Sequence, residues 1–220
     1  MTHQQYYNRL MQNVPRPLLP DEPKPFESPR LRGPHLFLHE IGETVLFIML
    51  IYCTVNIATI RYVVEGPSMA PNFESDQGII VDRLVYLLSE PGRGDVVIFH
   101  NPENPQVDFI KRVIGLPGET VRIFIGRVYI NGMLLDEPYI QEFCQNQRCD
   151  GTWQLGKDQY FVLGDNREHS YDGHSFGPIP RQLIVGQAWI RYWPPAEWGV
   201  IPHYTYGRIP AISLQTPERP

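Results

Sequence analysis

The chain has 220 residues, of which 42% are hydrophobic, which is enough for one large or two small domains with a sizeable core. The net charge of −5 and the lack of a cluster of basic residues argue against nucleic acid as a partner.

The N-terminal segment is rich in proline. Seven prolines fall between Pro15 and Pro34, among charged and polar residues. Such a segment cannot bury enough apolar surface to offset the entropy of ordering it, so residues 1–38 are predicted to be disordered.

The only long apolar run follows. Residues 44–60 (TVLFIMLIYCTVNIATI) carry no charge, and a helix of this length covers about 26 Å of a hydrocarbon core about 30 Å thick. We predict a transmembrane helix over residues 39–62, with Arg61 and Tyr62 at the membrane interface. A buried core helix is the alternative. A cleaved signal peptide fits less well, because about forty mostly polar residues precede the run.

The distribution of basic residues predicts the orientation of this helix. Lys24, Arg30 and Arg32 precede the apolar run, whereas Arg61 is the only basic residue among the twenty that follow it. The positive-inside rule therefore predicts a single-pass protein of the cell membrane with a cytoplasmic N-terminus and an extracytoplasmic domain.

After residue 62 the pattern changes to short strands. Asn131 and Gly132 form a two-residue hairpin turn, and other turns contain Gly and Pro. Strands this short predict a mainly β, barrel-like antiparallel domain, with no amphipathic helix. The expected strands cover residues 78–81, 84–88, 95–99, 109–114, 120–125, 127–130, 133–135, 160–163 and 183–189.

We expect this catalytic β domain to cover residues 63–206 and a polar tail to cover residues 207–220. The stretch 192–206 holds three tyrosines and two tryptophans among prolines. Such aromatic residues lie at membrane interfaces and also cap barrels, and the sequence does not choose between the two.

The three cysteines have different settings. Cys53 lies in the apolar run, whereas Cys144 and Cys149 bracket a short polar loop. The pair is a candidate disulfide, which would need an oxidising compartment. A zinc site would need two further ligands, and none is nearby in the sequence.

One serine is placed as a nucleophile would be. Ser68 lies in residues 63–71 (VVEGPSMAP), directly after the apolar run. The flanking Gly66 and Pro67 can hold its hydroxyl in one outward orientation. A simple turn is the alternative.

A serine needs a base to act as a nucleophile, and Lys111 is the candidate. In residues 107–114 (VDFIKRVI) a period of two puts Lys111 on one face with Phe109 and Val113. Burial against apolar side chains lowers the pKa of a lysine, so that it can accept a proton near neutral pH. An edge-strand lysine facing water is the alternative.

A second polar cluster covers residues 164–175. Its residues could form a triad, or a metal site of His169 and His174 with Asp165 and Asp172; a polar turn is the alternative. Residues so close in sequence seldom converge on one point, so the polar turn is favoured.

Four stretches, taken together and in order, resemble the conserved boxes of type I signal peptidases, the membrane-bound Ser-Lys endopeptidases. They are residues 66–71 (GPSMAP), 93–99 (RGDVVIF), 111–119 (KRVIGLPGE) and 164–167 (GDNR) with Ser170 and Asp172. The resemblance runs from about Thr44 to Trp189 and lies behind a single predicted span, which makes it far more specific than any one box.

The resemblance implies a set of roles. Ser68 would be the nucleophile, Lys111 the general base, and Ser170 would orient the lysine amine through a hydrogen bond. Asp165, Arg112 and Asp172 would support the site. No metal or organic cofactor is implied; the partners would be signal peptides of preproteins, the lipid bilayer and, by proximity, the export machinery.

The resemblance also implies cleavage after small side chains, typically alanine at the first and third positions before the scissile bond. Val64, Met69, Phe109 and Ile110 would form the pockets, and the substrate would pair as an added strand near Val64 and Asp108.

Two positions depart from the family pattern. Many members have an oxyanion-binding serine where this chain has Gly66, which leaves the backbone N–H of Ser68. Where members often show Asp-Ser-Arg, this chain has Asp172, Gly173 and His174.

Two rival interpretations remain. A self-cleaving repressor-type protease shares the chemistry, but it would be soluble and would bind DNA. A catalytically silent, membrane-anchored β-module that binds extended peptides is the alternative from another class.

Overall fold

The computed structural model describes residues 34–145 and 147–207. The predicted disordered segment lies outside the described residues up to residue 33, and the predicted polar tail lies outside them from residue 208 onward. Residues 34–38, which were expected to be disordered, instead begin a helix.

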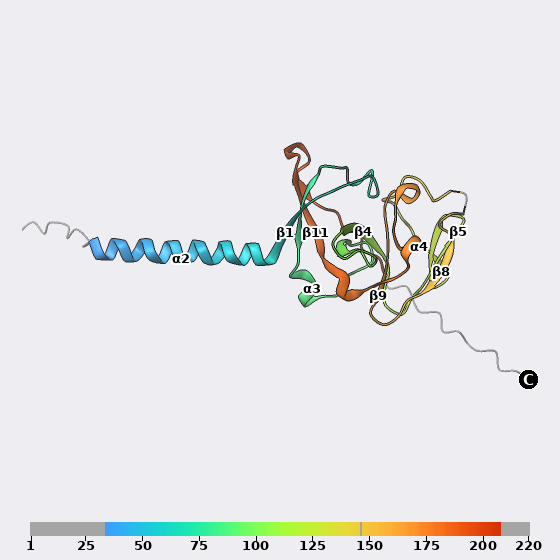
Figure 1. Cartoon of the computed structure of the whole chain (residues 1–220), viewed down its shortest axis with the longest axis horizontal. Coiled ribbons are helices and arrows are strands. Elements are labelled where there is room, and N and C mark those ends of the chain that lie inside the picture. The colour runs from blue at the N-terminus through green and yellow to red at the C-terminus, as the bar shows by residue number, and fades with distance from the viewer. Residues whose placement is uncertain (1–33, 146, 208–220) are drawn as a thin grey trace, which may run out of the picture. The chain divides into compact units, whose positions relative to one another are not determined.

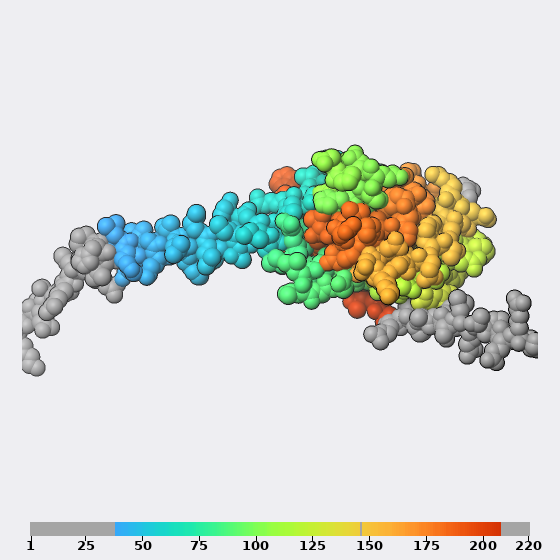
Figure 2. Space-filling model, turned by 60° about the horizontal axis from the view of Figure 1, so that its bottom comes forward, coloured from blue at the N-terminus to red at the C-terminus, as the bar shows by residue number. Residues whose placement is uncertain are grey.

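Helix α2 covers Pro34–Ala58. Residues Leu38–Ala58 are long and apolar enough to cross a membrane, and none of this segment is buried inside the protein. Apolar side chains such as Leu46, Phe47 and Met49 are exposed along the helix, which is blue in Figure 2. A helix that is apolar all round fits a transmembrane anchor.

Three polar side chains of α2 bind its own backbone. Thr44 Oγ1 donates to Glu40 O, Thr54 Oγ1 to Leu50 O and Asn56 Nδ2 to Tyr52 O, each at 2.8 Å. Donors satisfied within the helix cost less in a hydrocarbon environment, where no water replaces a missing partner.

The helix ends four residues earlier than predicted. Residues 59–62 belong to strand β1 instead, because these β-branched and aromatic side chains pair with β2. Tyr62 lies in β1 and not in the helix, and its hydroxyl donates to Asp108.

The described chain as a whole is mainly β, with one N-terminal apolar helix. This confirms the predicted fold class. A large antiparallel sheet has the strand order β1-β2-β11-β3-β4-β9-β10, with β12 added to β11, and a smaller sheet has the order β7-β6-β5-β8. Figure 1 labels β1, β11, β4 and β9 of the large sheet and β5 and β8 of the smaller one. The strands are β1 (Thr59–Val63), β2 (Gly78–Asp82), β3 (Val96–His100), β4 (Asp108–Gly115), β5 (Thr120–Phe124), β6 (Arg127–Ile130), β7 (Met133–Leu134), β8 (Gly151–Gln154), β9 (Gln159–Leu163), β10 (Ile179–Pro180), β11 (Ile184–Trp193) and β12 (Gly199–Val200).

One expected strand is wrong. Most of residues 84–88 form the short helix α3 (Val85–Leu88). Asp82 Oδ1 accepts the N–H groups of Leu84 and Val85, so its side chain turns the chain into a helical turn. The other short helices are α4 (Gly173–Phe176) and the 3-10 turns η1 (Arg167–His169), η2 (Arg181–Leu183) and η3 (Pro195–Glu197).

The large sheet is buried on both faces, as β3 illustrates. Val96 and Ile98 join one apolar cluster, whereas Val97 and Phe99 join another on the opposite face. A third cluster lies against the smaller sheet and includes Val121 and Ile130. Strand β4 lies between β3 and β9 in the large sheet, so the residues at its start lie next to the core.

Candidate active site

Ser68 lies in the loop between β1 and β2, which is held on both sides. Before it, Val64 is buried, and its N–H donates to Gln77 O at 2.9 Å. After it, Met69 is fully buried, and Phe73 N–H donates to Met69 O. Ser68 itself is partly exposed. The loop therefore fixes a reachable hydroxyl between two buried anchors.

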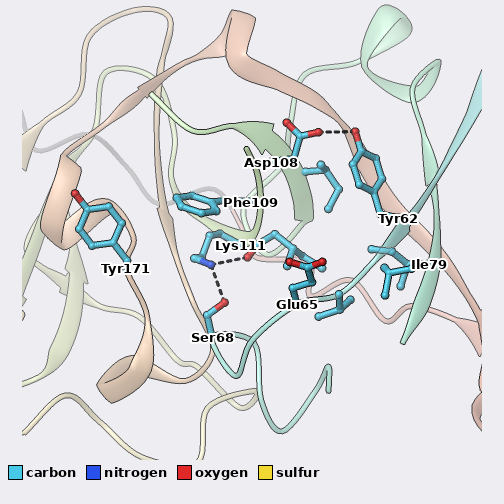
Figure 3. Close-up of a pocket in the computed structure, with 12 residues that line it drawn as sticks. Tyr62, Glu65, Ser68, Ile79, Asp108, Phe109, Lys111 and Tyr171 are labelled. Carbon is cyan, nitrogen blue, oxygen red and sulfur yellow. Dashed lines mark hydrogen bonds between the residues drawn. The ribbon is translucent and has the colours of Figure 1, made fainter. Parts of the chain in front are cut away.

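Lys111 brings its amine to this hydroxyl. Nζ lies 2.7 Å from Ser68 Oγ and 2.9 Å from Ile110 O, as the dashed lines in Figure 3 show. The residue is 3% exposed, and its nitrogen lies 5.2 Å from the centre of the Phe109 ring. Lys111 thus lies on the face that it was predicted to share with Phe109, and this face is apolar and shielded from water.

Burial changes the acid–base behaviour of Lys111. Desolvation lowers its pKa from 10.5 to about 8, although the charges of Asp172 and Asp165 oppose the shift. At pH 7 roughly one molecule in ten then carries a neutral amine. A neutral amine at this distance can accept the Ser68 proton.

A buried ion pair supports the strand that carries the lysine. Arg112 Nε and Nη2 donate to the two carboxylate oxygens of Asp165 at 2.8 and 2.6 Å, and its Nη1 donates to Gly94 O. Asn72 Nδ2 donates to the same carboxylate at 2.8 Å. Asp165 therefore ties the neighbour of Lys111 to a residue four positions after Ser68.

Asp172 is fully buried and collects three donors. One carboxylate oxygen accepts Gly164 N–H at 2.8 Å; the other accepts His174 N–H and lies 2.7 Å from His174 Nδ1. His174 thus contacts the aspartate where the family pattern has an arginine.

The expected hydrogen bond from Ser170 to Lys111 is not formed. Ser170 Oγ is buried and has no hydrogen-bond partner among the described residues. A Cβ at position 164 would overlap both Ser170 Oγ and Ser68 O, so Ser170 lies beside the nucleophile loop. The lysine amine instead bonds to Ser68 Oγ and Ile110 O.

Sequence reasoning missed Asn166. Its N–H donates to Ser68 O and its Nδ2 to Pro67 O, both at 3.1 Å. The residue stands in one of the four family boxes, which was the only available signal. Asn166 fastens the polar segment after β9 to the loop of the nucleophile.

The expected oxyanion donor is available. The backbone N–H of Ser68 makes no hydrogen bond to other described residues. Gly66 has a φ of +79°, and a Cβ there would meet nothing within 4 Å. A serine at this position would have room, but its backbone would be strained.

A pocket of about 260 Å³ opens beside Ser68. Four buried aliphatic side chains form its floor: Val64, Ile79, Ile98 and Ile110. Of the residues predicted to contact substrate, Val64, Asp108, Phe109 and Ile110 line the pocket, whereas Met69 does not. The remaining lining residues are Tyr62, Val63, Glu65, Ser68, Lys111 and Tyr171.

Two unpaired strand edges border this pocket. Among the described strands, β1 pairs only with β2. Residues 108–111 of β4 pair only with β3 in the described structure, because pairing with β9 begins at Arg112. An extended peptide laid between the two edges could bond to both as an added strand.

The other candidate residues lie outside the pocket lining. Cys144 and Cys149 are joined by a disulfide.

His169 Nδ1 lies 3.3 Å from Asn166 Oδ1, so the two histidines of the polar cluster contact different partners. Within the described part of the chain, no three His, Cys, Asp or Glu side chains gather as metal ligands would.

Comparison with known proteins gives consistent similarities. The family model described as "Signal peptidase, peptidase S26" matches residues 38–193. The chain is 42% identical over 175 residues to "Signal peptidase I" of Leptolyngbya laminosa, covering 76% of this chain and 82% of the relative. It is 36% identical over 189 residues to "Probable signal peptidase I-2" of Synechocystis sp., covering 82% and 85%.

A third relative and a solved structure carry the name signal peptidase I as well. "Signal peptidase I" of Bacillus caldolyticus is 40% identical over 156 residues, covering 63% of this chain and 85% of the relative. A crystal structure of a signal peptidase I from Enterococcus faecalis is 34% identical, with a TM-score of 0.41, and covers 45% of this chain and 97% of that chain.

Proposed function

This chain belongs to the signal peptidase family, peptidase S26, and is a serine endopeptidase; we propose that it removes signal peptides from exported preproteins with a dyad of Ser68 and Lys111. The observation that carries the proposal is the 2.7 Å separation of Lys111 Nζ and Ser68 Oγ around an amine of lowered pKa. A nucleophile within hydrogen-bond reach of its base is the minimum that this chemistry requires.

The reaction proceeds in two halves. Neutral Lys111 accepts the Ser68 proton as Oγ attacks the peptide carbonyl, and the Ser68 N–H stabilises the oxyanion. The lysine then returns the proton to the leaving amine, which leaves an acyl-enzyme. Lys111 then takes a proton from water, which attacks the ester and releases the acid, and the lysine returns that proton to Ser68 Oγ.

The other site residues hold this geometry in the proposal. Asp165 and Arg112 brace β4 against the nucleophile loop, and Asp172 fixes Gly164 at the edge of the site. Ser170 fills the space beside the Ser68 carbonyl. None of these groups exchanges a proton with substrate.

Substrate binding follows from the pocket. The peptide lies extended between β1 and the start of β4, with alternate side chains pointing into an aliphatic floor. Small side chains at the first and third positions before the scissile bond, as in Ala-x-Ala, suit so shallow a hollow.

Helix α2 supplies the location. As the one candidate membrane span among the described residues, it keeps the site at the membrane surface where preproteins emerge from the export machinery, which raises their effective concentration. We place the N-terminus in the cytoplasm and the β domain outside, following the excess of Lys24, Arg30 and Arg32 before the span.

Incubation of the full-length protein in detergent with a preprotein carrying an Ala-x-Ala site tests the proposal. We expect Ser68→Ala and Lys111→Met to lose at least about a thousandfold in kcat/KM. Lys157→Met removes an exposed lysine outside the pocket lining and is the matched control, with unchanged activity. Equal cleavage by wild type and both dyad variants would refute the assignment of Ser68 and Lys111.

A further inference from the structure

Tyr171 lines the pocket at the end that lies beyond the dyad. Figure 3 shows the dyad between the ring of Tyr171 and that of Tyr62. Tyr171 is 49% exposed and follows Ser170 in the polar segment after β9. A Cβ on Gly164 would come within 2.2 Å of Ser170 Oγ and 2.4 Å of Ser68 O, so this segment lies directly beside the nucleophile.

Tyr171 is held from two directions. Its ring packs edge-on against Phe176, with 5.7 Å between the ring centres and 63° between the ring planes. Its hydroxyl donates to Glu103 Oε2 at 2.7 Å. Glu103 belongs to the loop between β3 and β4, and its N–H donates to Asn101 Oδ1 at 2.9 Å. The pair thus joins two loops and presents an exposed ring with a carboxylate at its tip.

The charge around this end of the pocket is negative on balance. Within the described residues, neither Glu103 nor Glu65 has a Lys or Arg partner for its exposed carboxylate. Glu65 lines the pocket, as does Asp108, whereas Lys111 is the one basic residue among the described lining residues. A cationic group entering here is therefore favoured over an anionic one.

In the proposed reaction, Tyr171 lies on the side of the leaving segment. Ser68 attacks the carbonyl of the last residue before the scissile bond, and the residues before that one extend toward Tyr62. The chain after the scissile bond continues past the dyad in the opposite direction. Two extended residues cover about 7 Å, so the first two residues of the leaving segment reach the Tyr171 ring.

We infer that Tyr171 and Glu103 bind the first two residues after the scissile bond and select basic side chains over acidic ones. The inference deepens the proposed function and rests on it. The stem of a Lys or Arg side chain packs on the ring, while its charge interacts with the ring face and with the Glu103 carboxylate. An acidic side chain at the same place is repelled by that carboxylate.

Two matched peptide substrates, cleaved by the full-length protein in detergent, test the inference. They share an Ala-x-Ala segment and carry either two lysines or two glutamates directly after the scissile bond. We expect wild type to prefer the lysine peptide on the order of tenfold in kcat/KM at low ionic strength.

Two variants separate the contributions to this preference. Glu103→Gln removes the charge but keeps an acceptor for the Tyr171 hydroxyl, and should lower the ratio of the two kcat/KM values about fivefold. Tyr171→Leu keeps an apolar side chain but removes the ring, and should lower the ratio about threefold.

Glu90→Gln is the matched control. Glu90 also accepts a tyrosine hydroxyl, from Tyr160 at 3.0 Å, and does not line the pocket. The substitution changes the net charge of the protein by the same amount as Glu103→Gln, so we expect the ratio of wild type.

A wild-type ratio of one or less, an unchanged ratio in either Glu103→Gln or Tyr171→Leu, or an equal fall in Glu90→Gln overturns the inference while the proposed function stands. If wild type cleaves neither peptide, the proposed function fails and the inference falls with it.

Discussion

Lys111 and Lys157 have the same side chain, and only their surroundings separate a base from an ordinary surface lysine. Lys111 is 3% exposed and lies beside Phe109, whereas Lys157 is exposed. Water stabilises an ammonium strongly, so its exclusion favours the neutral amine. The proposed base is thus produced by burial, and the carboxylates of Asp172 and Asp165 limit how far the pKa falls.

The pH dependence of kcat/KM follows from this shift. Because only neutral Lys111 accepts the Ser68 proton, kcat/KM should rise about tenfold per pH unit below pH 8 and level off above it. The measurement is a pH profile on the Ala-x-Ala preprotein, limited to the range in which the protein stays folded. A limb centred near pH 10.4, the value of a solvated lysine, would contradict the burial argument.

Linkage gives the sign of the effect on stability. The unfolded state binds more protons than the folded state between about pH 8 and pH 10.5, so the Lys111 contribution to stability increases as pH rises through that window. Below pH 8 the buried amine is a constant cost to folding.

Loss of the Asp165 carboxylate should lower stability strongly. Its two oxygens accept from Arg112 and Asn72, and the side chains of Arg112 and Asp165 are 2% and 0% exposed. Asp165→Asn leaves a guanidinium buried without its counter-charge, and we expect a loss of about 3–5 kcal/mol in the free energy of unfolding.

Denaturant unfolding followed by tryptophan fluorescence measures this loss. Glu90→Gln is the control, because Glu90 is 76% exposed in its pair with Arg181 and should change stability by less than about 1 kcal/mol. Equal effects of the two substitutions would argue against a structural role for the buried pair.

At the scale of elements, the site depends on strands that stop pairing. The sheet leaves β1 without a second described partner and leaves the first four residues of β4 free on one side. Unpaired edges attract other strands, which exposes a protein to aggregation. Here the edges border a pocket, and the hydrogen bond from Tyr62 to Asp108 joins the two strands.

A second element, the disulfide loop 144–149, lies against the polar segment that holds the nucleophile loop. Cys149 Sγ lies 3.8 Å from Arg167 O, and Gln145 N–H donates to Glu168. The same segment carries Asn166, which binds Ser68 O. A continuous set of contacts thus leads from the disulfide loop to the active site.

Removal of the disulfide should cost stability. For a closed loop this short, chain entropy predicts a loss of about 2 kcal/mol in the double variant Cys144→Ala/Cys149→Ala. Reductant should shift the unfolding of wild type and leave the double variant unaffected. Alkylation of Cys144 and Cys149 in untreated protein, located by mass spectrometry, would show that no disulfide forms, whereas Cys53 should react in either case.

At the scale of the whole molecule, the chain combines an apolar helix with a β domain, and we propose a different role for each. Residues Leu38–Ala58 of the helix are long and apolar enough to cross a membrane, and the β domain carries the dyad and the pocket. In our proposal the first is the anchor and the second is the extracytoplasmic catalyst. A disulfide agrees with that placement, because disulfides persist in oxidising compartments.

Labelling of lysines tests the orientation. Lys157 is exposed on the β domain, whereas Lys24 precedes the span. A membrane-impermeant amine reagent added to intact cells should label Lys157 and spare Lys24, and both should react after permeabilisation. Labelling of Lys24 alone in intact cells would reverse the proposed topology.

Local sequence patterns predicted most of the elements. The alternation in β4 and the apolar run before Arg61 depend on neighbouring residues, so a single sequence suffices to recognise them. The errors occur where side chains override propensity: Asp82 turned an expected strand into α3, and pairing with β2 ended α2 early. The missed strands β8, β10 and β12 have four residues or fewer, too few for a period to emerge.

The sequence by itself determined the family, the apolar helix, the mainly β fold, and the two residues proposed as nucleophile and base. Only the tertiary structure decided that Ser68 and Lys111, 43 residues apart, lie within a hydrogen bond, that Ser170 makes none, and that Tyr62 reaches Asp108. The physical reason is that a residue's type and period depend on its neighbours in the chain. The exclusion of water from an amine, and the partner of a hydroxyl, depend instead on strands that the fold brings together from distant parts of the chain.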